Sequence, residues 1–206
     1  MIAKASGYVR GNRQAAAARL TSHMKYTEHR SMSERETRDD RRIFSKEEDV
    51  VSRRDAVNDI MQHTSTSANY HKVVLSPGQD EPVTDWKEWT REVMADLEER
   101  QGHELHWYAT KHDNTDNPHV HVVIAGAGEN RETGRAEPVK LYSPDYRFME
   151  ASGREHSEHE WYRQVSDLVK EYDSQERDLT TGQTPERDQG MEVTRSADFD
   201  RGDFDR

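Results

Sequence analysis

Three of the chain's eleven histidines lie within ten positions in the segment HDNTDNPHVHVVI, residues 112–124. His119 and His121 alternate with valine, and alternate side chains leave a β-strand on the same face. His112 stands at the end of a preceding strand, and the six-residue connection between them suits an antiparallel hairpin. The sequence therefore predicts that the three imidazoles meet at one end of a sheet. The other face of the strand is expected to point toward a core through Val120, Val122 and Ile124.

Three converging imidazoles with open coordination positions form a site for a divalent metal that also holds a substrate. The chain has no cysteine, so the metal ligands must be nitrogen or oxygen atoms. Imidazole ligation alone does not choose among manganese, zinc, nickel and cobalt. Magnesium is a further candidate where the substrate supplies oxygens. The alternative interpretation, surface histidines on a hairpin, accounts less well for a third histidine at the adjoining strand end.

Helices and strands in mixed order must position these histidines. A strand over residues 2–9 is predicted to lead into a helix from about Arg13 to Lys25, with Tyr26 at or just beyond its end. The further predicted elements are a helix after a capping box of Ser45 and Glu48, a strand at 69–75, a helix capped by Thr84 or Asp85 and stopped by Gly102, strands at 104–112 and 119–125, a short strand in EPVKLY, a helix from Ser143 to Gly153, and a last helix that begins at Ser157. This order favours an α+β fold, with a central antiparallel β-sheet flanked by helices.

The composition is polar, since 31% of the residues are hydrophobic and 34% are charged. This predicts one modest domain, residues 1–173, with a charged flexible loop at about 28–44 and a disordered charged tail at 174–206. There is no apolar run of membrane-spanning length and no signal peptide, so a cytoplasmic protein without membrane insertion is expected. The net charge of −11 argues against nucleic acid as a partner. However, the first 27 residues carry five basic residues and no acid, which favours a local basic face.

The histidine segment resembles the third motif of conjugative plasmid relaxases, which belong to the His-hydrophobe-His endonuclease superfamily. It is similar to that of the mobilisation relaxases related to the T-DNA border endonuclease, which usually reads His-x-Asp-x-x-x-Pro-His-x-His. Asn114 occupies the aspartate position here, and the flanking Asp113 and Asp116 are the candidate acids that orient a ligand histidine. The resemblance covers roughly residues 1–150 and implies a relaxase-type fold. It also implies a divalent metal, manganese or magnesium, held by His112, His119 and His121.

Family relaxases carry a nucleophilic tyrosine near the N-terminus, after a helix, and the segment ARLTSHMKYTEHR places Tyr26 there. The alternative is that Tyr26 only packs the end of that helix. A second family motif, a serine that closes a strand, resembles VVLSP and implies that Ser76 contacts DNA at the cleaved end. Arg19 and Lys25 are candidates for binding DNA phosphates near Tyr26. Replication initiators of the same superfamily place the tyrosine after the histidines, so the alternative nucleophiles are Tyr162 and Tyr172.

The function implied by the resemblance is a relaxase that nicks one strand at a plasmid origin of transfer and keeps the 5′ end as a phosphotyrosine. The implied partners are single-stranded DNA at the origin, accessory proteins and a coupling protein, and aromatic residues such as Tyr108 are candidates for stacking on bases. Two alternatives stay open. One is a rolling-circle replication initiator or transposase-like nuclease with the same metal site. The other is a non-catalytic DNA-binding mobilisation accessory protein whose histidines hold a structural metal.

Overall fold

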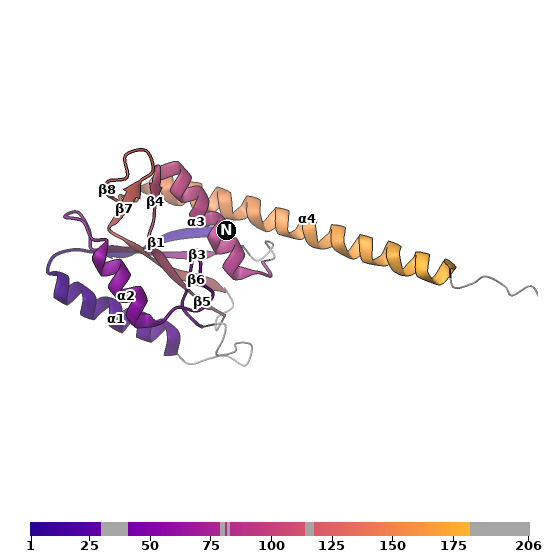
Figure 1. The fold of residues 1–206 in the computed structure, drawn as a ribbon, viewed down its shortest axis with the longest axis horizontal. Helices are drawn as coiled ribbons and strands as arrows, with labels where there is room; N and C mark the ends of the chain where they lie inside the picture. The colour runs from indigo at the N-terminus through magenta and orange to yellow at the C-terminus, as the bar shows by residue number, and fades with distance from the viewer. Residues whose placement is uncertain (30–40, 79–80, 82, 114–117, 182–206) are drawn as a thin grey trace, which may run out of the picture. The chain divides into compact units, whose positions relative to one another are not determined.

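The computed structural model describes residues 1–206 except 30–40, 79–80, 82, 114–117 and 182–206 (Figure 1). The chain divides into two compact units, Met1–Ser166 and Asp167–Arg206. Most of the predicted loop at 28–44 lies outside the described residues, as does the predicted tail from residue 182 onward. Residues 174–181, which the sequence assigned to the tail, are helical. Among the described helices, none combines the length and the apolar character that a membrane span requires.

Two antiparallel sheets form the centre of the first unit. The larger sheet has the strand order β1 (Ile2–Val9), β3 (Tyr70–Ser76), β6 (His119–Ala125), β5 (Trp107–His112) and β2 (Phe44–Ser45). The smaller sheet has the order β4 (His103–Glu104), β7 (Ala127–Asn130) and β8 (Ala136–Pro138). The single strand predicted at 104–112 is therefore divided between two sheets. The predicted α+β fold, a central antiparallel sheet flanked by helices, is confirmed.

Helices cover both faces of the larger sheet (Figure 1). On one face lie α1 (Arg13–His29) and α2 (Arg53–Gln62), and on the other lie α3 (Trp86–Gln101) and the first turns of α4 (Ser143–Thr181). The core between the sheet and α3 contains the alternate residues of β6, as predicted, and all three are buried: Val120, Val122 and Ile124. The histidines of β6 must therefore leave on the α1 face.

A stripe of small and apolar residues fixes α1 on the sheet. Ala16, Leu20 and Met24 recur every four residues, are all buried, and belong to one core cluster with Tyr70 and Val123. The helix continues past this stripe to His29. The sequence predicted that it would end near residue 25, which was too early, so Tyr26 lies inside α1 and not beyond it.

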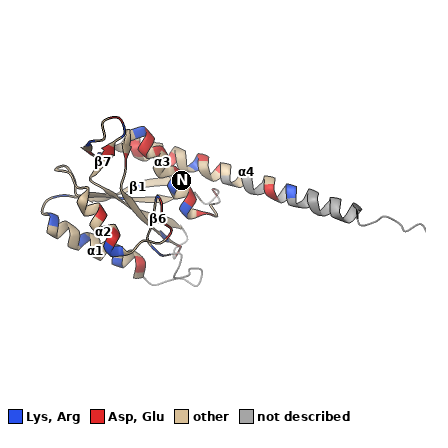
Figure 2. Cartoon of the chain, in the orientation of Figure 1, with Lys and Arg blue, Asp and Glu red and all other residues tan. Residues whose placement is uncertain are grey.

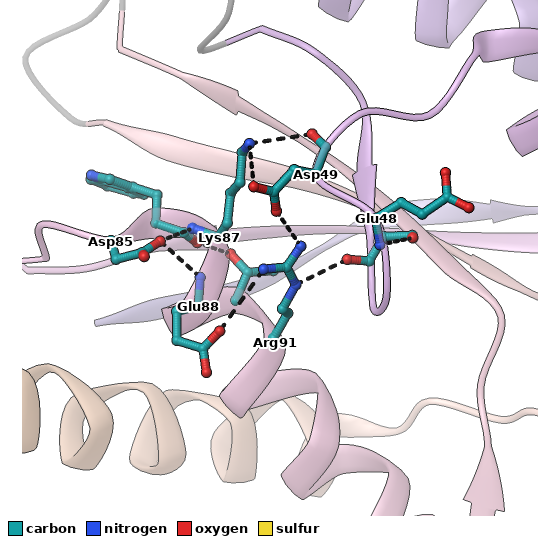
Figure 3. Close-up of polar contacts among 9 residues, drawn as sticks. Glu48, Asp49, Asp85, Lys87, Glu88 and Arg91 are labelled. Carbon is teal, nitrogen blue, oxygen red and sulfur yellow. Dashed lines mark hydrogen bonds and ion pairs between the residues drawn. The ribbon is translucent and has the colours of Figure 1, made fainter.

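Polar contacts fix the N-terminus of α3, as Figure 3 shows. Asp85 is the N-cap, and its Oδ1 accepts hydrogen bonds from two backbone N–H groups of the first turn at 3.1 and 3.0 Å. Arg91, one turn further on, donates to Asp49 Oδ1 at 2.6 Å and to the Ser45 carbonyl at 3.1 Å. The helix ends at Gly102, whose φ of 67° is left-handed. The predicted bounds of α3, Asp85 and Gly102, are confirmed, and the helix is tied to the segment that follows β2.

The second helix begins later than the sequence predicted. Ser45 accepts a hydrogen bond from the Glu48 N–H at 3.1 Å, but Ser45 belongs to strand β2. The N-cap of α2 is Ser52, whose hydroxyl accepts the Asp55 N–H at 3.1 Å. Both serines are followed three residues later by an acid, so the local pattern does not distinguish them. Because the neighbouring Phe44 is buried, Ser45 is held in the sheet and not at a helix start.

The last helix is continuous, whereas the sequence predicted one helix that Gly153 ends and a second that begins at Ser157; that prediction was wrong. Gly153 allows close packing inside the helix. A Cβ atom at this position would lie 2.0 Å from Met1 Sδ and 3.0 Å from Trp89 Cζ2. In addition, Trp89 Nε1 donates a hydrogen bond to the Gly153 carbonyl at 2.8 Å. Contact with Met1 and with Trp89 of α3 therefore outweighs the weak helix propensity of glycine.

Gly153→Ala is expected to lower the free energy of unfolding by about 1–3 kcal/mol, the usual cost of overpacking a core. Helix propensity alone predicts the opposite sign, a gain of about 1 kcal/mol. Urea denaturation of the purified chain measures the difference. Ala151→Gly, at an exposed position of the same helix, is the matched control for propensity. Increased stability of Gly153→Ala would mean that the Met1 and Trp89 side chains move to accommodate the added methyl group without loss of folding free energy.

His71 connects β3 to the segment after β8 on the α3 face of the sheet. The ring is buried, and its Nε2 lies 3.0 Å from the Val139 carbonyl oxygen, so Nε2 carries the proton of the neutral ring. Burial lowers the pKa of His71 below 6.5, and the hydrogen bond to Val139 opposes this shift only in part. The unfolded chain therefore takes up a proton at a pH where folded His71 does not.

The pKa of His71 predicts a loss of stability in acid. Its contribution is fully present above pH 6.5, the unfolded value, and is lost as the pH falls through the lower folded value. His71→Gln keeps a hydrogen-bond donor but does not titrate. Urea midpoints measured between about pH 7.5 and about 5.5 should therefore fall less steeply for the variant than for the wild type. Parallel curves would show that folded His71 accepts a proton as readily as the unfolded chain.

Candidate metal centre

The histidines of the HDNTDNPHVH segment meet at one end of the larger sheet. His112 on β5 pairs with His119 on β6, and His121 follows on the same face. The ring centroids lie 5.4 Å apart for His112 and His119, 4.6 Å for His112 and His121, and 4.9 Å for His119 and His121. One nitrogen from each ring lies within 4.8 Å of the others. The predicted convergence of the three imidazoles is confirmed.

The nitrogen positions fit a small divalent cation. Nε2 of His119 and Nε2 of His121 are 3.2 Å apart. Two nitrogens bound at about 2.1 Å to a tetrahedral metal are about 3.4 Å apart, so little movement is needed to bring both onto one ion. The three imidazoles include no charged ligand, so they would leave the full charge of the cation available to a substrate. This donor set accepts several divalent metals and does not choose among them.

His112 is held in one orientation by α1. The ring is fully buried, and its Nε2 lies 2.9 Å from the Thr27 carbonyl oxygen. A carbonyl only accepts, so Nε2 carries the proton and Nδ1 keeps the lone pair for a metal. Such hydrogen bonds set the tautomer and direction of metal-binding histidines. The sequence named Asp113 and Asp116 as the acids that could orient a ligand histidine. Asp113 Oδ2 lies 3.7 Å from Lys111 Nζ. Asp116 lies outside the described residues.

The turn of α1 from His23 to Thr27 lies on the histidines. The ring of His23 packs edge-to-face on His121, with centroids 5.9 Å apart. Thr27, one turn later, accepts the hydrogen bond from His112. Tyr26 belongs to this same turn, between the two contacts, and its side chain is 54% exposed. The fold therefore brings the backbone of the predicted nucleophile next to the three histidines.

His23 is a residue that the sequence analysis missed. The sequence feature that could have identified it is its spacing, because His23 precedes Tyr26 by three residues and so shares a helix face with it. Burial lowers the pKa of His23, and the positive charge of Lys72 on β3 lowers it further. A neutral imidazole and a lysine thus stand beside the metal-binding histidines. The positive charge of Lys72 favours an anionic ligand there, such as a phosphate group.

Ser76 closes β3 beside the histidines, and its hydroxyl donates to the Pro118 carbonyl at 2.8 Å. Pro118 directly precedes His119, so this hydrogen bond fixes the start of the histidine-bearing strand. Arg19 and Lys25 are exposed on α1, and Figure 2 shows basic residues along that helix. The roles of Ser76, Arg19 and Lys25 in binding DNA stay predictions.

A family model, the relaxase MobA/VirD2-like nuclease domain, matches residues 13–138. The matched range runs from the first residue of α1 through both histidine-bearing strands and makes up more than half of the chain. The chain belongs to this relaxase family. No curated protein and no solved structure matches it significantly. Membership makes the protein a DNA relaxase, and it implies binding of single-stranded DNA and use of a divalent metal.

A second group of titratable side chains in the relaxase joins α2 to β5. The rings of His63 and His106 stack in parallel, with centroids 3.4 Å apart, and the Asp59 carboxylate lies 3.2 and 3.1 Å from their Nδ1 atoms. Nitrogen lone pairs lie in the ring planes, so two parallel stacked rings do not aim at one ion. This arrangement therefore suits hydrogen bonding to Asp59 and not a metal. Tyr108, predicted to stack on bases, donates its hydroxyl to Asp59 at 2.9 Å.

The alternative nucleophiles of the relaxase lie on α4. Tyr162 is 64% exposed in the first compact unit, and Tyr172 belongs to the second. The first turns of α4 pack on the sheet face opposite the metal-binding histidines. Contacts with those histidines come instead from α1, through His23 and Thr27. This geometry favours Tyr26 over Tyr162.

Proposed function

We propose that this relaxase nicks one DNA strand at a plasmid origin of transfer and keeps the new 5′ end as a phosphotyrosine on Tyr26. The observation that carries the proposal is the docking of α1 on the histidines. One turn of that helix orients His112 through Thr27, contacts His121 through His23, and includes Tyr26. A nucleophile and a candidate metal site for the scissile phosphate are therefore parts of one local structure.

The candidate metal ligands are His112, His119 and His121, and a divalent ion bound there would act as a Lewis acid on the scissile phosphate. The protein's own residues supply orientation and charge. The Thr27 carbonyl holds His112 in the tautomer that binds a metal, and Lys72 places a positive charge near the DNA backbone. Ser76 holds the start of β6 through Pro118.

The proposed step is a transesterification. The phenolic oxygen of Tyr26 attacks phosphorus, the bond from phosphorus to the 3′ oxygen breaks, and the phenolic proton leaves as the 3′ oxygen gains one. The phosphotyrosine conserves the energy of the phosphodiester, so the strand can be rejoined by the reverse step. An ordinary phenol has a pKa of about 10 and is a weak nucleophile at neutral pH. Nearby positive charge is therefore needed to favour the phenolate.

Local charge makes DNA binding compatible with a net charge of −11. The basic residues Arg19 and Lys25 project from α1, and Lys72 lies on the adjoining strand face. Contacts of this kind to phosphates are independent of base sequence and weaken with added salt. Single-stranded DNA at an origin of transfer is the proposed substrate, with accessory and coupling proteins as the proposed partners.

The test is covalent capture. The wild-type chain, incubated with Mn²⁺ and a library of single-stranded oligonucleotides, is expected to yield a protein–DNA adduct that survives denaturation. The same assay gives the cleavage position, because the released strand ends in the new 3′ hydroxyl and its length therefore locates the cut. Binding of DNA without any adduct would favour the alternative of a mobilisation accessory protein with a structural metal.

A further inference from the structure

A cavity of about 320 Å³ lies on the sheet face opposite the metal-binding histidines. Its lining includes Tyr8 on β1, His71 on β3, Tyr142 just before α4 and Tyr146 in its first turn. His71 pairs with Ile124, whose side chain is buried on the α3 face. The cavity is thus separated from the histidine site by the thickness of the sheet. Its volume is at the lower end of the range of pockets for small ligands.

The chemistry of the lining suits a nucleotide. Three tyrosines offer aromatic faces, and Arg10 and Lys140 offer positive charge. None of the residues that line the cavity is acidic, although the chain has 41 acidic and 30 basic residues. Asp145 precedes Tyr146 in the sequence, but its carboxylate is bound by Arg100 at 3.0 Å. An anionic ligand with a flat ring matches this combination of charge and aromatic surface.

The aromatic and cationic groups are already placed for such a ligand. The Arg10 guanidinium lies over the Tyr8 ring, 5.1 Å from its centroid, and donates to the Tyr8 hydroxyl at 2.8 Å. Tyr8 and Tyr142 are 54% and 61% exposed, so both rings are accessible to a ligand. Exposed aromatic rings beside fixed cations are the elements that bind single-stranded nucleic acid without sequence preference.

The edge strand β1 lies between this cavity and the histidine face of the sheet. His121 pairs with Val74 of β3, and Val74 pairs with Lys4 of β1, so Lys4 lies on the histidine face. β1 is the edge strand of the sheet. Two strand spacings, roughly 10 Å, therefore separate the histidine strand from that edge. Lys72 and Lys4 lie on the histidine face, and Tyr8 lies on the opposite face of the same edge strand.

We propose that the cavity of Tyr8, Arg10 and Tyr142 is a second DNA subsite, which binds one nucleotide of the single strand that flanks the cleaved phosphate. The base stacks on the exposed tyrosines, and Arg10 or Lys140 pairs with its phosphate. This inference rests on the proposed function, because it takes single-stranded DNA as the substrate. It adds a point of attachment on the other face of the sheet, reached around the edge strand.

The test compares the binding of a fluorescein-labelled dT oligomer of about 20 nucleotides, long enough to span several contact sites. Tyr142→Ala and Arg10→Ala are each expected to weaken binding at least roughly fivefold, the lower end of the range for loss of one stacked base. Trp161→Ala removes an exposed aromatic outside the cavity, and Arg135→Ala removes an exposed cation outside it. These two matched controls should bind as the wild type does. All four positions are exposed, so thermal melting should be unchanged.

A photocrosslink locates the contact. The same oligomer with 5-iododeoxyuridine at successive positions should crosslink to the tryptic peptide of Tyr8 or to that of Tyr142. Equal binding by all four variants, with crosslinks confined to α1, would overturn the subsite and leave the proposed function intact. Failure of the wild type to bind any oligomer would instead count against the proposed function. Binding of free dTMP as tight as that of the oligomer would also overturn the subsite, because the cavity would then recognise a free nucleotide.

Discussion

Tyr26→Phe is expected to fold, bind metal and bind single-stranded DNA as the wild type does, and to form no covalent adduct. The substitution keeps the ring and its packing and removes only the attacking oxygen. Because Tyr26 is half exposed, loss of its hydroxyl should leave the melting temperature unchanged. The expected effect on adduct formation is complete loss, since no other step of the reaction can form the phosphoester. Denaturing electrophoresis with a labelled oligonucleotide measures it.

Tyr162→Phe is the matched control, because Tyr162 is also exposed but lies on α4. It should form the adduct at the wild-type rate. The opposite result, an adduct with Tyr26→Phe and none with Tyr162→Phe, would establish the motif order of replication initiators. Mass spectrometry of the tryptic peptide that carries the nucleotide identifies the tyrosine directly. It also distinguishes Tyr172, should neither single substitution remove the adduct.

The histidine site could be predicted from the sequence because its geometry is local. Alternation in a strand puts His119 and His121 on one face, and the short connection brings His112 opposite His119. The same alternation correctly assigned Val120 and Ile124 to the core. None of these inferences depends on how distant segments pack. The helix bounds of α3 were predictable for the same reason, since an N-cap and a terminal glycine act within one turn.

Features that depend on packing between distant segments were missed. His23 and Thr27 become part of the site only when α1 lies on the sheet, and no local pattern gives the register of that contact. Gly153 was interpreted as a helix end because glycine often has that role. The position of Trp89 against it, from a different helix, is what reverses the interpretation. Ser45 was predicted to cap the second helix, whereas Ser52 has that role, because burial of the strand beside Ser45 is not visible in the local pattern.

His119→Ala and His121→Ala are each expected to weaken Mn²⁺ binding tenfold or more, which corresponds to about 1.4 kcal/mol or more of binding free energy. Each substitution removes one of three nitrogens that lie within 4.8 Å of one another, and the remaining pair holds an ion less well. Titration calorimetry on the whole chain without DNA measures the change, so the result does not depend on catalysis. Adduct formation should fall in parallel and recover in part at high Mn²⁺ concentration, because the lost affinity is offset by mass action.

His106→Ala is the control for the metal experiment, because His106 belongs to the group around Asp59 that also offers nitrogen and oxygen atoms at ligand spacing. The parallel stacking of His106 on His63 predicts that this variant binds Mn²⁺ as the wild type does. Unchanged affinity in both His119→Ala and His121→Ala would dispose of the three-histidine site. If affinity fell in His106→Ala alone, the metal would belong between α2 and β5, and the turn of α1 that holds Tyr26 would no longer adjoin it. The three variants together therefore decide whether the metal and the proposed nucleophile share one site.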